Sequence, residues 1–356
     1  MLFEALATEL VAHIFLSCTS VNDVLALSAT CRRFHLIYTS SLKISILEHA
    51  AEAQFGPLQD LTQLLTHNAS QPAHVIRYAP FSLALLQQIV HAGRIAEEWC
   101  NIYPFKKWKY DYENRRLLTS YERHHVRRAI YRLWLYTRAF HNRDHPREAR
   151  ALKPTMLKRA SLLHNWSTPE LAEMADVHAV LKEVVHSNIC PSNGTITRKF
   201  KKRYPDVSDH HLLFNIHVNY TPAVPTAPIY NPFTHHSYYT TTQTYVSRLT
   251  ASKFNVHTNH NIGAEGWGDD IPHYYVVEDM LKLDPEQILW LKENAPLKGM
   301  VEGYVRMLGD WFENNGETWS QTLQWVLEER GQDVGEFLDG VEGGALGVAV
   351  DASGDR

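Results

Sequence analysis

The chain has 356 residues, which is long enough for one large domain or two with buried cores. Its hydrophobic fraction of 44% and charged fraction of 21% are typical of a soluble globular protein. No run of about 18 apolar residues occurs, so a membrane span is not expected. The apolar opening contains Glu4, Glu9 and His13 with no basic residue before it, which argues against a signal peptide.

The cysteines are scattered and form no C-x-x-C pair, so we do not expect a disulfide framework. They are best interpreted as small core residues in a reducing compartment, which favours the cytoplasm or the nucleus. These four residues are Cys18, Cys31, Cys100 and Cys190.

The net charge of −4 hides an uneven distribution. Residues 104–204 contain 22 Lys and Arg against 9 Asp and Glu, whereas residues 265–356 contain 6 against 20. Two interpretations are open. The two regions attract each other within one fold, or the basic region recognises an acidic partner or a nucleic acid.

Apolar residues recur at helical spacing through the first 55 residues, which predicts short helices there. Gly56-Pro57 predicts a break and the first domain boundary. The helices expected after it cover residues 58–65, 80–100, 117–141, 152–163, 169–186, 284–293, 297–313 and 318–330. The fold class is therefore all-α.

The strongest periodicity lies in residues 117–141, where an apolar stripe predicts one buried helix face. Arg123, Arg127 and Arg138 lie away from the centre of this stripe. Its members are Val126, Ala129, Ile130, Leu133, Trp134, Thr137 and Phe140. Further along, Trp290, Trp311, Trp319 and Trp325 are expected to include core residues.

The rest of the chain is less regular. A polar break at residues 187–203 ends in a basic run, and residues 218–270 are rich in Pro, Tyr and His, which predicts a long irregular loop. Residues 341–356 are rich in Gly, Ala and Asp, which predicts a disordered tail. The expected domains are residues 1–55, residues 56–340 and this tail.

The opening segment carries an ordered motif: Leu6-Ala7-Thr8-Glu9-Leu10, Ile14-Phe15, Asn22-Asp23-Val24-Leu25-Ala26-Leu27-Ser28, and Thr30-Cys31-Arg32-Arg33-Phe34. This segment resembles the F-box, whose pattern opens with Leu-Pro-x-Glu-Leu and ends with Cys-Arg-x-aromatic. Ala7 stands where that family usually has proline, which removes a pre-set turn. Phe34 stands where tryptophan is frequent and keeps an aromatic side chain.

The resemblance implies a three-helix F-box and a non-catalytic adaptor. Such an adaptor binds a Skp-family subunit on a cullin scaffold and recruits a protein substrate to an SCF ubiquitin ligase. The residues expected to face Skp or to stabilise the F-box are Leu6, Leu10, Ile14, Phe15, Leu25, Leu27, Cys31 and Phe34. The alternative is a helical protein that binds nucleic acid or another polyanion through residues 104–204.

A physical argument points the same way, because three helices of about 40 residues cannot bury enough surface to be stable alone. Their surplus apolar residues must be covered by the rest of the chain or by a partner. The adaptor interpretation fails if Ile14, Leu25 and Phe34 are all sealed by this chain with no apolar face left open.

Two stretches resemble the C-terminal part of uncharacterised fungal F-box proteins. The first is residues 266–285 with Trp290-Leu291, and the second is residues 309–312 with residues 315–318. Trp267 with Asp269 and Asp270 is the candidate substrate-binding loop, and its alternative is a turn that caps the following helix.

No cofactor or metal site is expected. The histidine doublets lack ligand spacing, and His257-x-x-His260 has no cysteine near it. We find no P-loop, no G-x-S-x-G elbow and no convincing pair of catalytic carboxylates, so an enzyme is not expected.

Overall fold

The computed structural model describes residues 6–146, 149–191, 273–296, 298–309, 312 and 316–350. These residues form helices and contain no strand, which confirms the all-α class. None of the described helices is both long and apolar enough to cross a bilayer.

The first nine α-helices are α1 (Thr8–Leu16), α2 (Val21–Ser28), α3 (Arg32–Tyr38), α4 (Lys43–Phe55), α5 (Leu58–Thr66), α6 (Leu83–Lys107), α7 (Ser120–Phe140), α8 (Lys153–Leu163) and α9 (Thr168–Val184). A π-helical turn follows (Val185–Ile189), and then α14 (His273–Met280), α15 (Pro285–Asn294), α16 (Lys298–Leu308), α18 (Trp319–Glu329) and α19 (Val334–Glu342).

The chain divides into two compact units. The first comprises Met1–Leu135, Thr168–Val177 and Phe337–Arg356. The second comprises Tyr136–Ser167 and His178–Glu336. The division falls inside α7, α9 and α19, so each of these helices contributes to both units.

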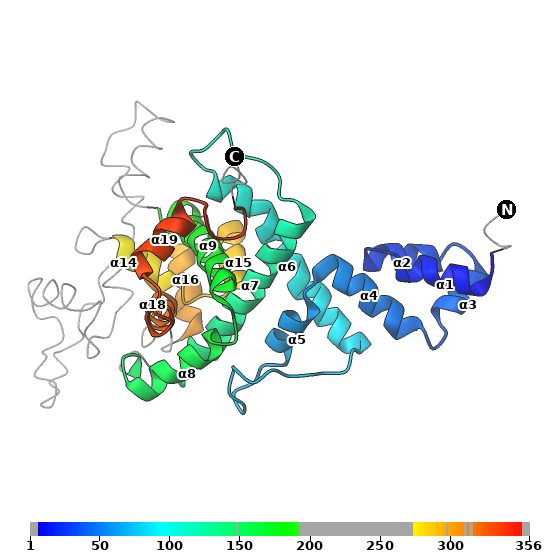
Figure 1. Ribbon diagram of the computed structural model, residues 1–356, viewed down its shortest axis with the longest axis horizontal. Helices are drawn as coiled ribbons and strands as arrows, with labels where there is room; N and C mark the ends of the chain where they lie inside the picture. The colour runs from blue at the N-terminus through cyan, green and yellow to red at the C-terminus, as the bar shows by residue number, and fades with distance from the viewer. Residues whose placement is uncertain are drawn as a thin grey trace, which may run out of the picture. The chain divides into compact units, whose positions relative to one another are not determined.

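In the first unit, α1, α2 and α3 gather at the N-terminal part of α4 (Figure 1). Ser20 Oγ accepts hydrogen bonds from the N–H groups of Asn22 and Asp23 and starts α2. Aromatic rings fill the small core. The ring of Phe15 lies 6.2 Å from that of Phe34 in an edge-to-face arrangement.

The Gly56-Pro57 break joins α4 to α5 through a cis peptide bond. Its neighbourhood is fixed by α7, because Arg127 Nε donates to the Gly56 carbonyl (2.9 Å) and Tyr131 Oη to the Phe55 carbonyl (2.8 Å). The Phe55 ring packs against Gly93 of α6. The opening helices are therefore anchored to α6 and α7 within the first unit.

Helix α7 bears out the predicted stripe, since Val126, Ile130 and Leu133 are buried. It is also buried on faces that the stripe leaves out, where Tyr131 and Arg127 lie. The sequence placed Arg127 away from the buried centre, and the structure buries it because it bonds to Gly56 and to Glu97 of α6.

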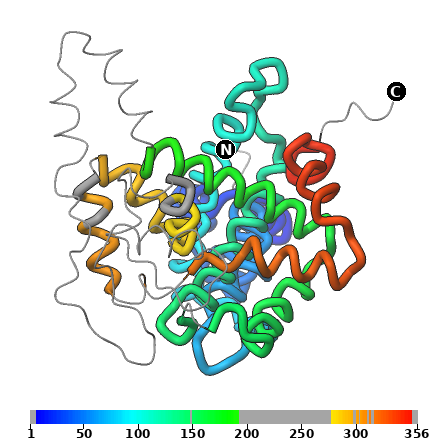
Figure 2. The backbone as a smooth tube through the Cα atoms, turned by 90° about the vertical axis from the view of Figure 1, so that its left-hand side faces the viewer, coloured from blue at the N-terminus to red at the C-terminus, as the bar shows by residue number. Residues whose placement is uncertain are grey.

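In the second unit, α8 and α18 lie side by side (Figures 1 and 2). A buried hydrogen-bond cluster connects them to the end of α7. Tyr136 Oη lies 2.9 Å from Thr318 Oγ1 and 2.8 Å from Thr322 Oγ1, and Arg159 Nε donates to Thr322 Oγ1 (3.0 Å).

The predicted tryptophan anchors have different environments. Trp319 is buried, Trp325 is partly buried and Trp290 is exposed. The ring of Trp290 stacks on that of Tyr304 at 4.8 Å. Trp311 lies outside the described residues.

The predicted disordered tail is wrong for residues 341–350. Helix α19 extends to Glu342, and Val348 and Ala349 are buried. The Val348 N–H donates to Asp176 Oδ2 (3.0 Å), and the Val341 carbonyl accepts from Lys107 Nζ (2.9 Å). These long-range contacts hold a segment whose composition alone favours disorder.

Candidate functional site

Helix α1 has two apolar faces. Val11 and Phe15 point into the core and are fully buried. On the other face, the side chains of Leu10 and Ile14 remain 52% and 36% exposed. A helix with a single inward stripe buries its large apolar residues, so this second face has no partner among the described residues.

The second face of α1 forms a shallow, mainly apolar depression. The few polar groups at its rim are turned to the chain itself, because Ser17 Oγ donates to the His13 carbonyl (2.8 Å) and Cys18 Sγ to the Ile14 carbonyl (3.4 Å). The residues that line it are Leu6, Leu10, His13, Ile14, Ser17 and Cys18. Its lining therefore presents mostly carbon to solvent.

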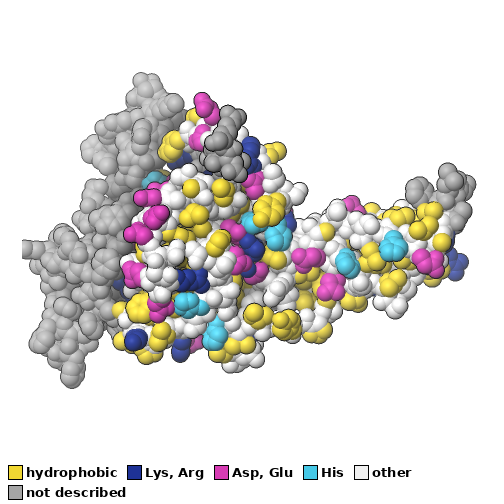
Figure 3. All heavy atoms as spheres, viewed as in Figure 1, with side chains coloured by type: hydrophobic (Ala, Val, Ile, Leu, Met, Phe, Trp, Pro, Cys, Tyr) yellow, Lys and Arg dark blue, Asp and Glu magenta, His cyan; other side chains and the backbone are white. Residues whose placement is uncertain are grey.

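The neighbouring helices add further exposed apolar residues. Leu25 of α2 is 46% exposed, and Leu36 of α3 is also exposed. Leu42 and Ile44, before and at the start of α4, are exposed as well. Figure 3 shows hydrophobic side chains at the surface over these N-terminal helices. We call the exposed residues Leu10, Ile14, Leu25 and Leu36 the N-terminal apolar surface.

The eight residues expected to face Skp or to stabilise the F-box fall into three groups. Leu10, Ile14 and Leu25 are exposed. Phe15 and Phe34 are buried, so only the stabilising role fits them. Leu6, Leu27 and Cys31 are partly exposed.

Cys31 has a local structural role, because its sulfur accepts a long hydrogen bond from the Phe34 N–H (3.5 Å) at the start of α3. Sequence reasoning did not select Leu36, Leu42 or Ile44. The sequence could have indicated their exposure, since each is a large apolar residue beside polar neighbours in a segment too short to bury it.

The candidate substrate residues Trp267, Asp269 and Asp270 lie outside the described residues. Within the described part of the chain, no group of three or more His, Cys, Asp or Glu is placed to hold a metal ion. Among the thiols, burial raises the pKa of Cys100 to about 12, which keeps it protonated.

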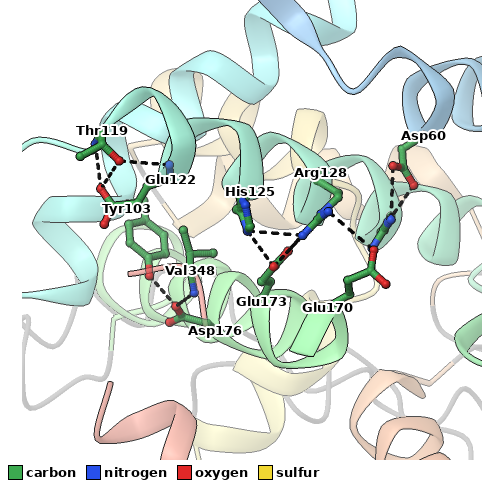
Figure 4. A network of polar contacts seen from close by, with 11 residues as sticks. Asp60, Tyr103, Thr119, Glu122, His125, Arg128, Glu170, Glu173, Asp176 and Val348 are labelled. Carbon is green, nitrogen blue, oxygen red and sulfur yellow. Dashed lines mark hydrogen bonds and ion pairs between the residues drawn. The ribbon is translucent and has the colours of Figure 1, made fainter. Parts of the chain in front are cut away.

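The basic region forms an ion-pair network between α7 and α9 (Figure 4). Arg128 Nη2 donates to both carboxylate oxygens of Glu173 at 2.6 Å, and His125 Nδ1 lies 2.7 Å from Glu173 Oε1. Arg132 Nε donates to Asp60 of α5 (2.7 Å), and its Nη1 lies 2.8 Å from Glu170 Oε1. The cations of α7 in this network are thus neutralised within the first unit.

Arginines nearer the start of α7 and just before it are also paired with carboxylates. Arg123 and Arg127 both pair with Glu97, and Arg116 forms a two-bond pair with Glu122. These carboxylates lie between residues 60 and 173 and not in the acidic region 265–356. For these arginines, the pairing thus differs from the expected attraction between the two oppositely charged regions.

Comparisons with protein-family models, with curated proteins and with solved structures each found no match for this chain.

Proposed function

We propose that the N-terminal apolar surface docks a Skp-family adaptor and that the chain is a non-catalytic substrate receptor of an SCF-type ubiquitin ligase. The observation that carries this proposal is the second apolar face of α1, where Leu10 and Ile14 are exposed beside a carbon-lined depression. The F-box-like motif supplies the identity of the partner. The exposed face of α1 supports a contact at this position.

The energetics favour a broad interface over a single contact. Full burial of a large apolar side chain contributes roughly 1.5–3 kcal/mol, and these side chains are already about half covered, so each has roughly 1 kcal/mol left to contribute. Four such residues offset only the low end of an association cost of about 4–15 kcal/mol. Partner contacts beyond Leu10, Ile14, Leu25 and Leu36 are therefore required.

The anchoring of the opening helices suits a receptor. A receptor must hold its substrate in a fixed position relative to its adaptor. Arg127 and Tyr131 bind the carbonyls of Gly56 and Phe55, so the segment after α4 is held within the first unit. A bound adaptor would be connected to α6 and α7 through packed side chains.

Co-expression with a Skp-family subunit tests the proposal. The intact chain is expected to co-purify with it as a stable complex. The double substitution Ile14→Asp with Leu25→Asp places two charges on the exposed surface, where they do not disturb the core, and is expected to abolish the complex. Circular dichroism checks that the variant stays helical.

The matched control is Leu83→Asp, a leucine on α6 with 45% exposure. It introduces the same kind of charge on an equally exposed leucine outside the proposed interface and is expected to leave the complex intact. A folded double variant that still binds the Skp-family subunit places the interface elsewhere. An intact chain that binds no such subunit refutes the adaptor function.

A further inference from the structure

The connection between α5 and α6 contains an extended segment. Residues 76–82 form neither a helical turn nor a bend, and Figure 1 shows a stretched piece of chain that leads into α6. Their side chains alternate between two environments. The exposed ones are those of Ile76, Tyr78 and Pro80, and the partly buried ones are those of Arg77, Ala79 and Phe81. This period of two is typical of a β-strand that has one face on the protein and one face in solvent.

One edge of this segment is held by the side chain of Gln63, a buried residue of α5. Gln63 Nε2 donates to the carbonyls of Val75 (2.7 Å) and Ala73 (3.1 Å). Gln63 Oε1 accepts from the Arg77 N–H (2.7 Å). In a strand, the carbonyl of one residue and the N–H of the residue two positions later point to the same side. The side-chain amide of Gln63 therefore takes the place that a neighbouring strand has in a sheet.

Arg77 ties the same segment to the end of α5. Its Nη1 donates to the Thr66 carbonyl, and its Nη2 donates to the Gln71 carbonyl (3.4 Å). Together with the bonds of Gln63, these contacts fix the segment in its extended conformation in the absence of any partner. A partner that binds it therefore loses little affinity to the ordering of this part of the chain.

The opposite edge of the segment is open. Because main-chain groups alternate along a strand, the N–H and carbonyl groups of Ile76 and Tyr78 point away from Gln63. Neither residue forms a hydrogen bond with any part of the chain that the structure describes. Their side chains are 49% and 90% exposed. The open edge ends at Pro80, which has no N–H to donate.

We propose that residues 76–80 bind an extended peptide segment of a substrate protein, which adds to them as a β-strand. A row of N–H and carbonyl groups two residues apart is matched by the main chain of another extended segment, and this pairing is a recurrent mode of peptide recognition. The word substrate rests on the proposed receptor function. The peptide binding itself depends on this segment alone.

The side chains around the open edge define the chemistry of the peptide. Ile76 and Tyr78 pack best against β-branched or aromatic side chains placed opposite them on the added strand. Residues 67–82 contain a single Lys, Arg, Asp or Glu, which is Arg77, and its guanidinium group binds the carbonyls of Thr66 and Gln71. The edge therefore selects an apolar strand and gives no preference for a charged one.

Fluorescence anisotropy on the full-length chain tests the inference with labelled peptides of the form Lys-Thr-X-Thr-X-Thr-X-Lys, where X is Val, Ile, Tyr or Phe. At least one of them is expected to bind at millimolar concentration. Methylation of the main-chain nitrogens is then applied to the X positions or to the Thr positions, which face opposite sides of a strand. One of the two methylated forms is expected to bind at least about tenfold more weakly, because its N–H groups are lost, and the other is expected to bind like the parent peptide.

Two substitutions at one position separate the main chain from the side chain. Tyr78→Ala removes the ring and keeps the N–H, whereas Tyr78→Pro removes both. Proline is compatible with an extended segment whose N–H faces solvent, and circular dichroism checks that both variants stay helical. Tyr78→Pro is expected to bind the peptide at least about fivefold more weakly than Tyr78→Ala, because the peptide carbonyl is left without its donor. Hydrogen exchange of the Ile76 and Tyr78 amides in the wild type is expected to slow when the peptide is bound.

Four outcomes overturn the inference. None of the peptides binds, or both methylated forms bind equally well, or Tyr78→Pro binds the peptide as tightly as Tyr78→Ala. The fourth is a wild-type dimer in light scattering that Tyr78→Pro dissociates, which would assign the edge to a second copy of this chain. Co-purification with the Skp-family subunit is measured in the same variants and is expected to be unchanged. Lost peptide binding with an intact Skp complex refutes the peptide site alone, and the reverse result refutes the adaptor function alone.

Discussion

At the scale of single residues, Asp176 has an unusually dense set of partners (Figure 4). It is buried on α9 and accepts hydrogen bonds from Tyr103 Oη (2.5 Å), Lys107 Nζ (2.8 Å) and the Val348 N–H (3.0 Å). Burial and the adjacent carboxylate raise the pKa of Tyr103 far above its ordinary value, so this hydroxyl stays a donor. One side chain thus connects α6, α9 and the segment after α19.

Removing this carboxylate is expected to cost about 3–5 kcal/mol in the free energy of unfolding, because it leaves Lys107 without its buried partner. Asp176→Ala is the test, measured by urea denaturation. Hydrogen exchange of the Val348 amide is expected to become faster in the same variant, since its acceptor is gone. The exposed residue Asp339 provides the control, and Asp339→Ala is expected to change neither quantity. Unchanged exchange at Val348 would show that other contacts hold the C-terminal segment.

At the scale of helices, replacing glycine by alanine is expected to have opposite effects on stability at two positions. Gly93 in α6 faces Phe55, and a Cβ there would lie 2.4 Å from its ring. Gly303 in α16 has no atom within 4 Å of the corresponding position. Alanine is a better helix former than glycine by about 1 kcal/mol in both helices.

Gly93→Ala is expected to destabilise the protein by about 1–3 kcal/mol, because the clash with Phe55 forces α4 and α6 apart and outweighs the propensity gain. Gly303→Ala is expected to stabilise it by up to about 1 kcal/mol. Thermal denaturation of the two variants measures both signs. A stabilising Gly93→Ala would mean that α4 does not pack on α6 as described.

Sequence periodicity predicted the helices well because local spacing is enough to identify an apolar stripe, as at Val126 and Ile130. It could not predict that Arg127 is buried, since its partners Gly56 and Glu97 lie far away in the sequence. The prediction of disorder for residues 341–350 failed for the same reason. It depends on Asp176 and Lys107, which composition does not reveal.

The candidate site was predicted in part. The surplus of apolar residues in a short segment predicted an uncovered face, and Ile14 and Leu25 lie on such a face. The motif alone could not separate these from Phe15 and Phe34, because core and surface positions of three short helices alternate too closely. Only packing assigned the two aromatic rings to the interior.

At the scale of the whole molecule, stability is expected to depend on pH through a few buried groups of the second unit. Burial, with the nearby charges of Lys282 and Arg159, lowers the pKa of His141 to about 3. Burial and Lys182 lower the pKa of His178 to about 3.

Glu317 acts in the opposite direction. Burial raises its pKa to about 7, although its carboxylate accepts hydrogen bonds from the N–H groups of Trp319 and Ser320. The folded form therefore holds a proton on Glu317 that the unfolded form releases, and this contribution is lost as the pH rises from about 4.5 through about 7.

For His141 the sign is reversed, because the unfolded chain takes up a proton below its ordinary pKa of about 6.5 and the folded chain does not. The contribution of a neutral His141 is complete above that pH and falls by roughly 2 kcal/mol by about pH 5.

Glu317 offsets part of this loss, so we expect Glu317→Gln to lose more stability between about pH 7 and about pH 5 than the wild type. Adding His141→Gln to that variant is expected to remove roughly 2 kcal/mol of the loss, as measured by urea denaturation at the two pH values. An equal loss with and without His141 would show that this imidazole takes up its proton in the folded protein.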